Sequence, residues 1–423
     1  MTPLESCVAT FRRWLYLPDP GALYITLAAV AANLGPGDPV WLLMIGPPGG
    51  GKTEVLAPLT SLDNVHPTAT LTEAALLSGT PRKEREAGAK GGLLREIGSF
   101  GIIVCKDFGS VLNMHRDARA AVMAALREVY DGSWTRHVGT GGGKTLAWEG
   151  KVGLIAGCTP AIDSHHAVMG SMGERFVLYR LPKVDDDQQA GAALAHVGRE
   201  PEMRAELTSA VGTLIAAVDR GVLGRQIDPD DHARLVALAT LAVRCRSAVE
   251  RDSYHREIEL IPEPEAPGRL ALVLLRLLNG LTAVGVDQAT AWQLITKAAL
   301  DSMPAVRRIV LEAVRTETGP IETSALAKSI GYPKTTARRA LEDLAAHGIL
   351  ASSQAGGGNS PMFWTLTGWA RSRWPNVPET SGGVQQTSDP ETSGGSITSC
   401  PEEREDFSGT LQPLGPLDPA EVF

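Results

Sequence analysis

Residues 40–53 read VWLLMIGPPGGGKT, and this stretch decides the fold. The apolar run at 40–45 is predicted to be a buried strand, and it leads directly into the pattern GxxxxGK[ST] at 46–53. The residues after it open a predicted helix, so backbone N–H groups and a helix N-terminus converge on one anion. This order of strand, glycine-rich loop and helix predicts a phosphate-binding loop rather than a chance glycine-rich turn.

The loop predicts ATP and Mg²⁺ as cofactors. Lys52 would neutralise the β- and γ-phosphates, and the Thr53 hydroxyl would ligate Mg²⁺. The residues assigned to nucleotide binding in the loop are Gly46, Pro47, Pro48, Gly49, Gly50, Gly51, Lys52 and Thr53. A second stretch, 139–145, also ends in Gly-Lys-Thr but is one residue too short, and strand-like alternation on both sides of it predicts a hairpin turn.

The rest of the chain divides around this loop. Short apolar runs at 40–45, 102–105 and 152–156 alternate with helical patterns, which predicts an α/β P-loop core with a parallel sheet and flanking helices at 36–185. A helical segment at 1–35 precedes it, broken near residues 18–21. An all-helical domain is expected at 186–300, a winged-helix domain at 301–374 and a disordered acidic tail at 375–423.

The tail carries the net charge. Residues 375–423 hold nine acidic side chains and one basic one, which equals the formal net charge of −8. The remaining chain has 39 acids and 39 bases, so the acidic balance does not argue against a nucleic-acid partner. The hexapeptide PETSGG occurs at 378–383 and again at 390–395, a low-complexity composition that predicts disorder. We expect a solvated spacer, with DNA mimicry or recruitment of a replication protein as the alternatives.

The cysteines and apolar runs bear on the compartment. Five scattered cysteines include no Cys-x-x-Cys pair, which argues against a zinc site or a disulfide framework and fits a reducing cytoplasm. The apolar stretch at 22–34 is shorter than the roughly 20 residues of a membrane span. The N-terminus also lacks the pattern of a secretory signal. These features predict a cytoplasmic protein with no membrane partner.

A predicted strand at 102–105 ends near Asp107, where P-loop ATPases hold Mg²⁺ or its water. The usual Asp-Glu pair is absent, because the sequence reads Lys106-Asp107-Phe108. If Asp107 is the metal-binding acid, Phe108 replaces the catalytic glutamate; if Asp107 is the glutamate equivalent, Lys106 replaces the metal-binding acid. Both assignments stay open, beside a purely structural Asp107, and either one predicts slow hydrolysis or an acid from elsewhere.

With these motifs in order, residues 36–185 resemble an AAA+ ATPase with a pre-sensor-1 hairpin, such as the MCM-type helicases and the enhancer-binding transcription activators. The resemblance rests on a predicted helix at 116–130, a hairpin at 134–149 and a strand at 152–159. It implies that Thr159 occupies the sensor-1 position and orients the attacking water near the γ-phosphate. A hydroxyl bonded at a strand end is the alternative role for Thr159.

The same resemblance implies a site shared between subunits. Residues 170–176 are similar to the Ser-Arg-Phe segment of MCM-like proteins, which makes Arg175 the candidate arginine finger; an internal salt bridge is the alternative. Arg269 resembles the sensor-2 arginine of a lid domain and is assigned to nucleotide binding. The resemblance therefore implies a homo-oligomer, expected to be a ring such as a hexamer.

The third unit resembles a winged-helix domain of the MarR or ArsR kind. Predicted helices at 305–316, 324–330 and 334–347 are followed by two strands and a glycine-rich wing within 349–367. Residues 301–374 carry nine bases and six acids. DNA binding is assigned to Lys334, Thr335, Thr336, Arg338 and Arg339 on the recognition helix, and to Arg136 and Lys144 on the hairpin. Docking of a protein is the alternative role of such a domain.

Three functions fit this sequence. The leading prediction is an ATP-hydrolysing helicase or helicase loader that acts on single- or double-stranded DNA during replication of a phage, plasmid or mobile element. The second is an ATP-responsive winged-helix transcription regulator. The third is a nucleotide-binding switch with little turnover, which the missing Asp-Glu pair suggests.

Overall fold

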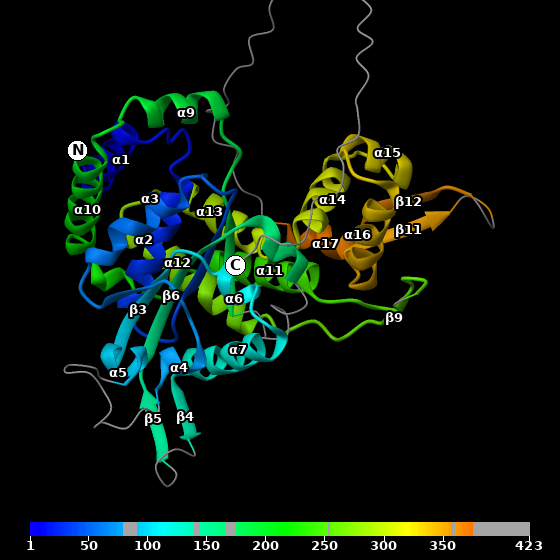
Figure 1. Cartoon of the computed structure of the whole chain (residues 1–423). Coiled ribbons are helices and arrows are strands. Elements are labelled where there is room, and N and C mark those ends of the chain that lie inside the picture. Colours follow the sequence, from blue (N-terminus) through cyan, green and yellow to red (C-terminus); the bar gives the residue numbers. More distant parts are fainter. Residues whose placement is uncertain are drawn as a thin grey trace, which may run out of the picture. The chain divides into compact units, whose positions relative to one another are not determined.

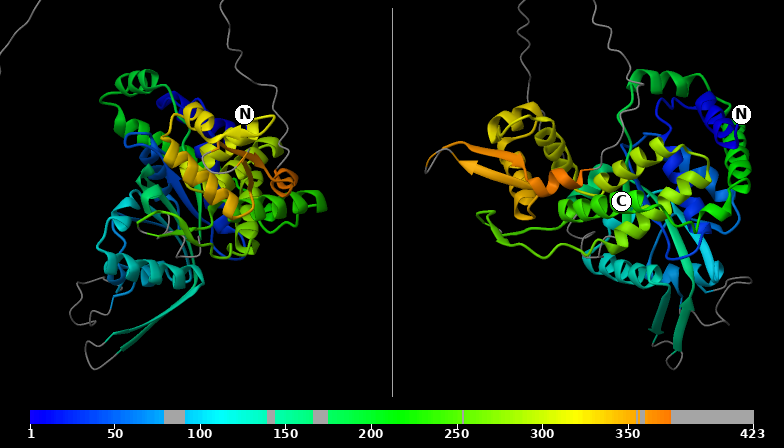
Figure 2. Two further views of the ribbon diagram at one scale, coloured as in Figure 1. Left: turned by 90° about the vertical axis from the view of Figure 1, so that its right-hand side faces the viewer. Right: turned by 180° about the vertical axis from the view of Figure 1, so that it is seen from behind.

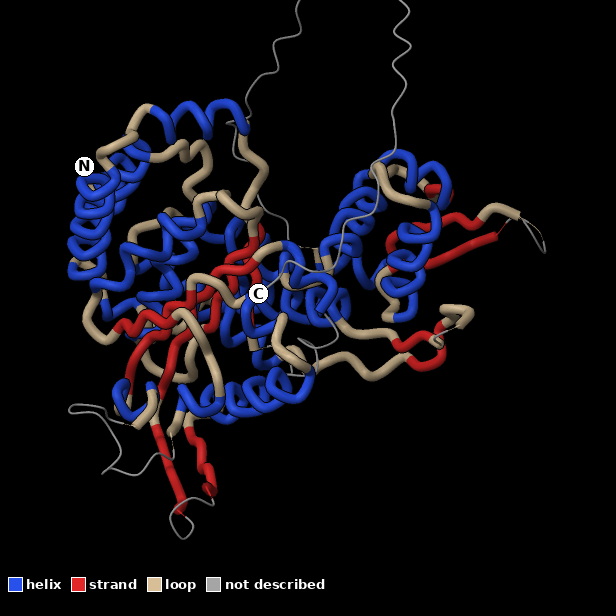
Figure 3. Tube along the Cα trace, in the orientation of Figure 1, coloured by secondary structure: helices blue, strands red, loops and turns tan. Residues whose placement is uncertain are grey.

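The computed structural model describes residues 1–78, 91–138, 144–165, 175–252, 254–354, 356 and 360–374. These residues belong to one compact unit, which spans Met1–Pro378. The segment at 375–423, predicted to be disordered, lies outside the described residues. Figure 1 labels the elements, and Figure 3 shows helices and strands along the same trace.

A five-stranded parallel sheet forms the centre of the fold. Its order is β2-β3-β6-β1-β7, and every neighbouring pair is parallel. The strands are β1 (Trp41–Ile45), β2 (Val65–Thr68), β3 (Phe100–Cys105), β6 (Lys151–Cys158) and β7 (Phe176–Arg180). All five side chains of β1 are buried, as expected for a parallel strand covered on both faces. The predicted α/β fold class is confirmed.

One face of the sheet packs against a large helical layer. It contains α1 (Pro3–Trp14), α2 (Gly21–Leu34), α3 (Lys52–Leu56), η1 (Ala57–Ser61), α10 (Glu200–Ala216), α11 (Pro229–Arg246), α12 (Gly268–Ala283) and α13 (Gln288–Asp301). Leu27 on α2, Leu42 on β1 and Leu274 on α12 belong to the same buried cluster. The helices predicted as a separate domain at 186–300 thus share their main hydrophobic core with the sheet. Within this range, α9 (Asp186–Leu194) contributes no buried residue.

A second group of elements covers the other face. They are α4 (Glu73–Leu76), α5 (Leu93–Ile97), α6 (Gly109–Leu112), α7 (Arg116–Tyr130) and the base of a hairpin formed by β4 (Ser133–Val138) and β5 (Lys144–Glu149). Trp134 and Trp148 face each other across this hairpin, and both are buried. The predicted hairpin is therefore confirmed, and Figure 1 shows it projecting from the sheet on the side away from α9.

The C-terminal part is a winged helix. It contains α14 (Ala305–Thr316), β10 (Ile321–Glu322), α15 (Thr323–Ser329), α16 (Lys334–Ala346), β11 (Leu350–Gln354), β12 (Met362–Leu366) and α17 (Gly368–Arg373). Its three strands pair in the order β10-β12-β11. A hairpin that the sequence did not predict, β8 (Glu250–Arg251) with β9 (Ile258–Leu260), extends below this domain in Figure 1 and in the right view of Figure 2. Arg251 ties its base to Glu342 and Asp343 on α16.

Two further 3-10 turns are η3 (Pro160–His165) after β6 and η4 (Arg220–Val222) before α11. Among the helices of the described residues, none has both the length and the apolar character that crossing a bilayer requires.

Candidate functional site

The predicted phosphate loop connects β1 to α3. Its first residue, Gly46, donates its N–H to the carbonyl of Cys158 at 3.1 Å, which holds the loop against the end of β6. Gly49 and Gly51 have φ angles of 74° and 79°, in the left-handed region. A Cβ at either position would meet no atom within 4 Å, so the backbone conformation, and not lack of space, requires glycine there.

Lys52 lies folded over this loop. Its Nζ donates to the carbonyl oxygens of Gly46 and Pro47, both at 2.7 Å. Burial lowers the pKa of Lys52, whereas the nearby Cys158 and Asp107 act in the opposite direction. The ammonium group is therefore positioned by the loop itself and lies close to Asp107.

Asp107 follows the end of β3 and is exposed. Its carboxylate accepts the N–H of Gly109 at 2.9 Å, and its backbone carbonyl accepts the hydroxyl of Ser110 at 2.8 Å. Phe108 is fully buried and contacts Phe176, with ring centroids 5.2 Å apart, so its side chain belongs to the core. Phe108 therefore faces the core, and Asp107 supplies the carboxylate of this segment beside the phosphate loop.

Thr159 follows the end of β6, which lies between β3 and β1 in the sheet. Because the strands are parallel, the segments after β1, β3 and β6 all begin at the same carboxyl edge, where ligands bind in open α/β sheets. The structure therefore brings Lys52, Asp107 and Thr159 to one edge. Among the described residues, no group of three or more His, Cys, Asp or Glu side chains is arranged to hold a metal ion.

Arg175 lies at the opposite, amino edge of the sheet, directly before β7. One guanidinium nitrogen, Nη2, lies 2.7 and 3.0 Å from the two carboxylate oxygens of Asp131, and the group lies over the ring of Tyr130 at 5.3 Å. The side chain is only 8% exposed. The internal salt bridge that was the alternative to an arginine finger is therefore present, and the finger role stays a prediction.

Arg269 also lies toward the amino edge. It is the second residue of α12 and pairs with Glu265 at 3.3 Å. Arg276, two turns further along α12, pairs with Asp38, which precedes β1. Burial raises the pKa of Tyr130 to about 12, and Arg276, Arg269 and Arg175 are near enough to oppose that rise. The structure does not bring Arg269 to Lys52 of the same chain.

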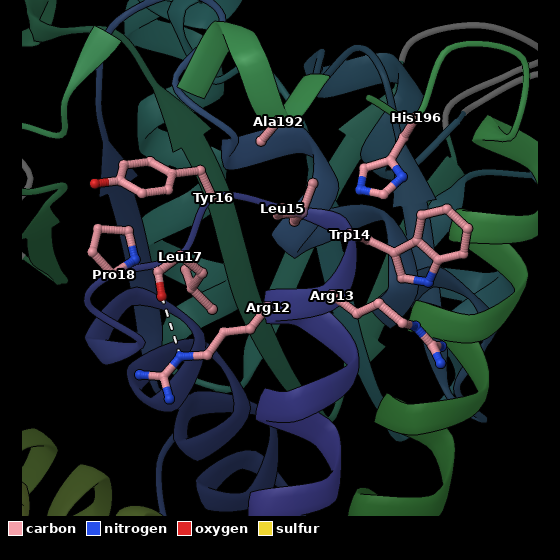
Figure 4. A pocket seen from close by; sticks show the side chains of 9 residues that line it. All are labelled: Arg12, Arg13, Trp14, Leu15, Tyr16, Leu17, Pro18, Ala192 and His196. Carbon is pink, nitrogen blue, oxygen red and sulfur yellow. Dashed lines mark hydrogen bonds between the residues drawn. The ribbon is translucent and has the colours of Figure 1, made fainter. Parts of the chain in front are cut away.

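A pocket of about 290 Å³ lies where α1 ends, beside α9 (Figure 4). Its lining residues are Arg12, Arg13, Trp14, Leu15, Tyr16, Leu17, Pro18, Ala192 and His196. The rings of Trp14 and His196 lie 4.8 Å apart. The chain reaches α9 from β7 by way of Leu181, which packs closely on Gly46 of the phosphate loop. The chain thus runs from the carboxyl end of β7, past the phosphate loop, to the helix that lines one side of the pocket.

Sequence reasoning missed this pocket. The segment at 14–18 reads WLYLP, with two aromatic side chains just before the helix break, and this was the one signal that could have indicated it. The residues that complete the pocket, on α9 and after it, are about 175 positions away in the chain.

The recognition helix presents the predicted DNA-binding residues. Lys334, Thr335, Arg338 and Arg339 are exposed on the first turns of α16, and Thr336 is half-buried. Arg338 pairs with Glu342 one turn further on, at 2.7 Å. This placement agrees with a helix that can meet phosphates and base edges; that it does so stays a prediction.

The two hairpin residues are placed differently. The Arg136 guanidinium donates to the carbonyl of Leu77 at 2.6 Å and pairs with Glu73 at 2.9 Å, and its side chain is 22% exposed. Arg136 thus anchors β4 to α4 in this structure. Lys144 begins β5, but its side chain lies outside the described part of the chain. Contact of either residue with DNA stays a prediction.

Comparisons with known proteins identify one domain. Residues 309–353 match the family model described as the IclR helix-turn-helix domain, which spans α14 from Ile309 through α15 and α16 into β11. The helix-turn-helix predicted from the sequence is therefore confirmed. No curated protein matches the chain.

Solved structures show weak similarity. One is the Orc1 protein of Aeropyrum pernix in complex with DNA, at 18% identity over 84% of this chain and 92% of that chain, with a TM-score of 0.26. Another is an apo form of the NrS-1 C-terminal region, at 11% identity over 86% of this chain and 76% of that chain, with a TM-score of 0.27. Because these TM-scores are low, neither structure indicates a function for this chain.

Proposed function

We propose that this protein binds ATP and Mg²⁺ at residues 46–53 and hydrolyses ATP as an AAA+-type ATPase that acts on DNA. The observation that carries the proposal is the arrangement of Lys52, Asp107 and Thr159 at one carboxyl edge, on a chain that also bears a helix-turn-helix domain. At the finer level, we favour a helicase or helicase loader of the MCM-like kind in replication of a phage, plasmid or mobile element. The β4–β5 hairpin directly before β6 supports that choice.

The residues present fit the nucleotide and the metal. The left-handed glycines at 49 and 51 turn the loop backbone, and Lys52 lies over it, hydrogen-bonded to two carbonyls of the loop that a phosphate could replace. Lys52 would bind the β- and γ-phosphates, and Thr53 with Asp107 would hold Mg²⁺, which neutralises charge on the phosphates. Thr159 would orient the attacking water. The pocket at the end of α1 would receive the base.

Arg175 and Arg269 would contribute to ATP hydrolysis only where two copies of the chain meet. Both lie toward the amino edge, and β1 alone spans about 17 Å at roughly 3.3 Å per residue. Each would therefore reach a nucleotide only on a neighbouring copy, and the pair between Arg175 and Asp131 would have to open. We accordingly propose a homo-oligomer, with a ring as the form that the resemblance implies.

ATP hydrolysis by single variants and by their mixture tests both the proposed ATPase activity and the proposed site shared between two copies. Steady-state ATP turnover is measured with and without single- and double-stranded DNA for the wild type, Lys52→Ala and Arg175→Ala, with Arg220→Ala on the surface at η4, outside the winged helix, as the control. Both site variants should lose DNA-stimulated turnover. A mixture of the two should regain part of it, because some interfaces then combine an intact Lys52 with an intact Arg175 from the other copy.

Other outcomes separate the alternatives. If the mixture stays inactive while each variant remains folded by circular dichroism, Arg175 does not act across an interface. If the wild type binds ATP but shows no turnover above Lys52→Ala, the protein is a nucleotide-binding switch.

The helix-turn-helix match favours one second candidate, an ATP-responsive transcription regulator. Tight binding to one duplex site would support the regulator. Salt-sensitive binding to any single strand would support the helicase or loader.

A further inference from the structure

Charged side chains gather where β7 ends. The guanidinium of Arg180, the last residue of β7, donates through two nitrogens to the two carboxylate oxygens of Asp163 at 2.7 and 2.8 Å. Asp163 lies in η3, four residues after Thr159. The side chains are 15% and 27% exposed, so this forked pair is partly shielded from water and holds a fixed geometry. The segment that carries the candidate sensor threonine is thereby fastened to the edge strand of the sheet.

The same carboxylate reaches the winged helix. Oδ1 of Asp163 also accepts the N–H of Ala305, the first residue of α14, at 3.1 Å. Arg180 in turn donates to the carbonyl of Met303 at 3.2 Å, just before α14. Asp163 and Arg180 therefore connect the segment after β6 directly to the start of the helix-turn-helix domain.

The connection continues along the edge of β7. The N–H of Leu178 donates to the hydroxyl of Ser302 at 3.2 Å, and the N–H of Arg180 donates to the carboxylate of Asp301 at 2.8 Å. Asp301 is fully buried and forms ion pairs with Lys297 on α13 and Arg308 on α14. The end of α13 and the short segment after it thus provide hydrogen-bond partners for the open edge of β7. The ion pairs of Asp301 hold this segment to both α13 and α14.

This arrangement makes the start of α14 sensitive to the segment at 159–165. The hydrogen bonds of this forked pair hold only over a narrow range of distance and angle, and separating a partly buried pair leaves charges without partners, which is unfavourable. A shift of this segment on nucleotide binding would therefore either move Ala305 with it or break the Asp163 contacts. Either response changes how α14, and with it α16, is held.

We propose that Asp163 and Arg180 are positioning residues that couple the nucleotide site to the DNA-binding domain. The proposal rests on the proposed function and adds to it a route of regulation. By thermodynamic linkage, if ATP changes the affinity for DNA by some factor, DNA changes the affinity for ATP by the same factor. Couplings between sites are typically about 5- to 150-fold.

The experiment measures the coupling factor, which is the factor by which nucleotide changes the affinity for DNA and DNA changes the affinity for nucleotide. DNA affinity is determined by fluorescence anisotropy on the full chain without nucleotide, with ADP and with a non-hydrolysable ATP analogue; nucleotide affinity is determined with and without DNA. The variants are Asp163→Asn and Arg180→Lys, with thermal unfolding as the check on folding. Glu312→Gln is the matched control, because it removes a carboxylate that pairs with Arg308 on α14 itself.

We expect the coupling factor to fall to near one in Asp163→Asn and Arg180→Lys. The nucleotide affinity without DNA, and the DNA affinity without nucleotide, should stay within about twofold of the wild type, and Glu312→Gln should keep the wild-type coupling. The double variant Asp163→Asn/Arg180→Lys should lose no more coupling than either single one, since both act through one pair.

Two results would overturn the proposal. One is a wild type that binds ATP and DNA with no coupling; the other is full coupling in a folded Asp163→Asn variant. Both leave the proposed function standing. Failure of the wild type to bind ATP at all would instead refute the proposed function, and the coupling with it.

Discussion

Replacing Asn33 should destabilise the fold more than its size suggests. Asn33 is 1% exposed near the end of α2, where its side-chain amide donates to the carbonyls of Ala29 and Val40 at 2.8 and 2.9 Å. Its Oδ1 accepts the N–H of Val40 at 2.9 Å. One side chain therefore satisfies both backbone polar groups of the residue that enters β1, and Gly153 on β6 leaves the room for it.

The expected loss of stability comes from the two backbone groups of Val40 that would be left without hydrogen-bond partners. Val40 is fully buried, so Asn33→Ala removes the partners of one N–H and one C=O in a place that has little access to water. A buried polar group without a partner costs about 1–3 kcal/mol, so the two together predict a loss of about 2–6 kcal/mol in the free energy of unfolding. That is a large share of the roughly 5–15 kcal/mol of a typical protein.

Thr26 supplies the control. It is fully buried in the same helix, but its hydroxyl donates to the carbonyl of Ala22 within that helix, at 2.7 Å. That carbonyl can keep its helical partner, so Thr26→Val should cost about 1 kcal/mol or less. Urea unfolding followed by circular dichroism gives both values. Equal losses in the two variants would refute the reasoning, because burial alone would then explain the effect of Asn33.

Two further predictions concern packing and pH. Gly280→Ala should destabilise the protein by about 1–3 kcal/mol, because the added methyl group would collide with the carbonyl oxygen of Ala28 where α12 packs on α2. Gly212→Ala, with open space around it, should instead stabilise α10 by about 0.5–1 kcal/mol, and urea unfolding measures both changes. Burial, with a smaller contribution from Arg276, lowers the pKa of Lys151 to about 8, whereas an unfolded lysine titrates at about 10.4. The unfolded chain therefore binds more protons between about pH 8 and 10.4, so wild-type stability should rise with pH across that range; Lys151→Met should lower this rise in the unfolding midpoint, and an unchanged slope would contradict the assignment.

Elements with a strong local pattern could be predicted from the sequence. The structure places α7 at Arg116–Tyr130 and α14 at Ala305–Thr316, the ranges that the sequence predicted. Both are amphipathic, and α14 begins directly after Pro304, which sets its N-terminal boundary. The phosphate loop was equally accessible, because its glycines, lysine and threonine are local requirements of phosphate binding.

Other elements depend on distant partners. Strand β2 lies at the sheet edge and contains Pro67 with a partly exposed face, so it lacks the apolar run of a central strand. The hairpin of β8 and β9 is held by Arg251, which bonds to residues about 90 positions later on α16. Nothing near these segments in the sequence shows those contacts, so periodicity alone did not find them.

Arg175 illustrates the same limit at the candidate site. The sequence motif suggested a side chain that reaches another subunit, but motif similarity does not show which side chain lies beside it. Asp131 is 44 positions earlier, at the end of α7, and only the fold brings its carboxylate to the guanidinium. The sequence could name the internal salt bridge as an alternative and could not choose it.

The direction of the strands then decides what one copy can do alone. Lys52, Asp107 and Thr159 follow the carboxyl ends of their strands, whereas Arg175 precedes the amino end of β7. In a parallel sheet these positions are a full strand length apart, about 17 Å for a five-residue strand. A side-chain rearrangement cannot bridge that distance within one chain. If Arg175 acts on a nucleotide directly, as we propose, that nucleotide must be bound by a second copy, and an isolated copy would hydrolyse ATP without the arginine.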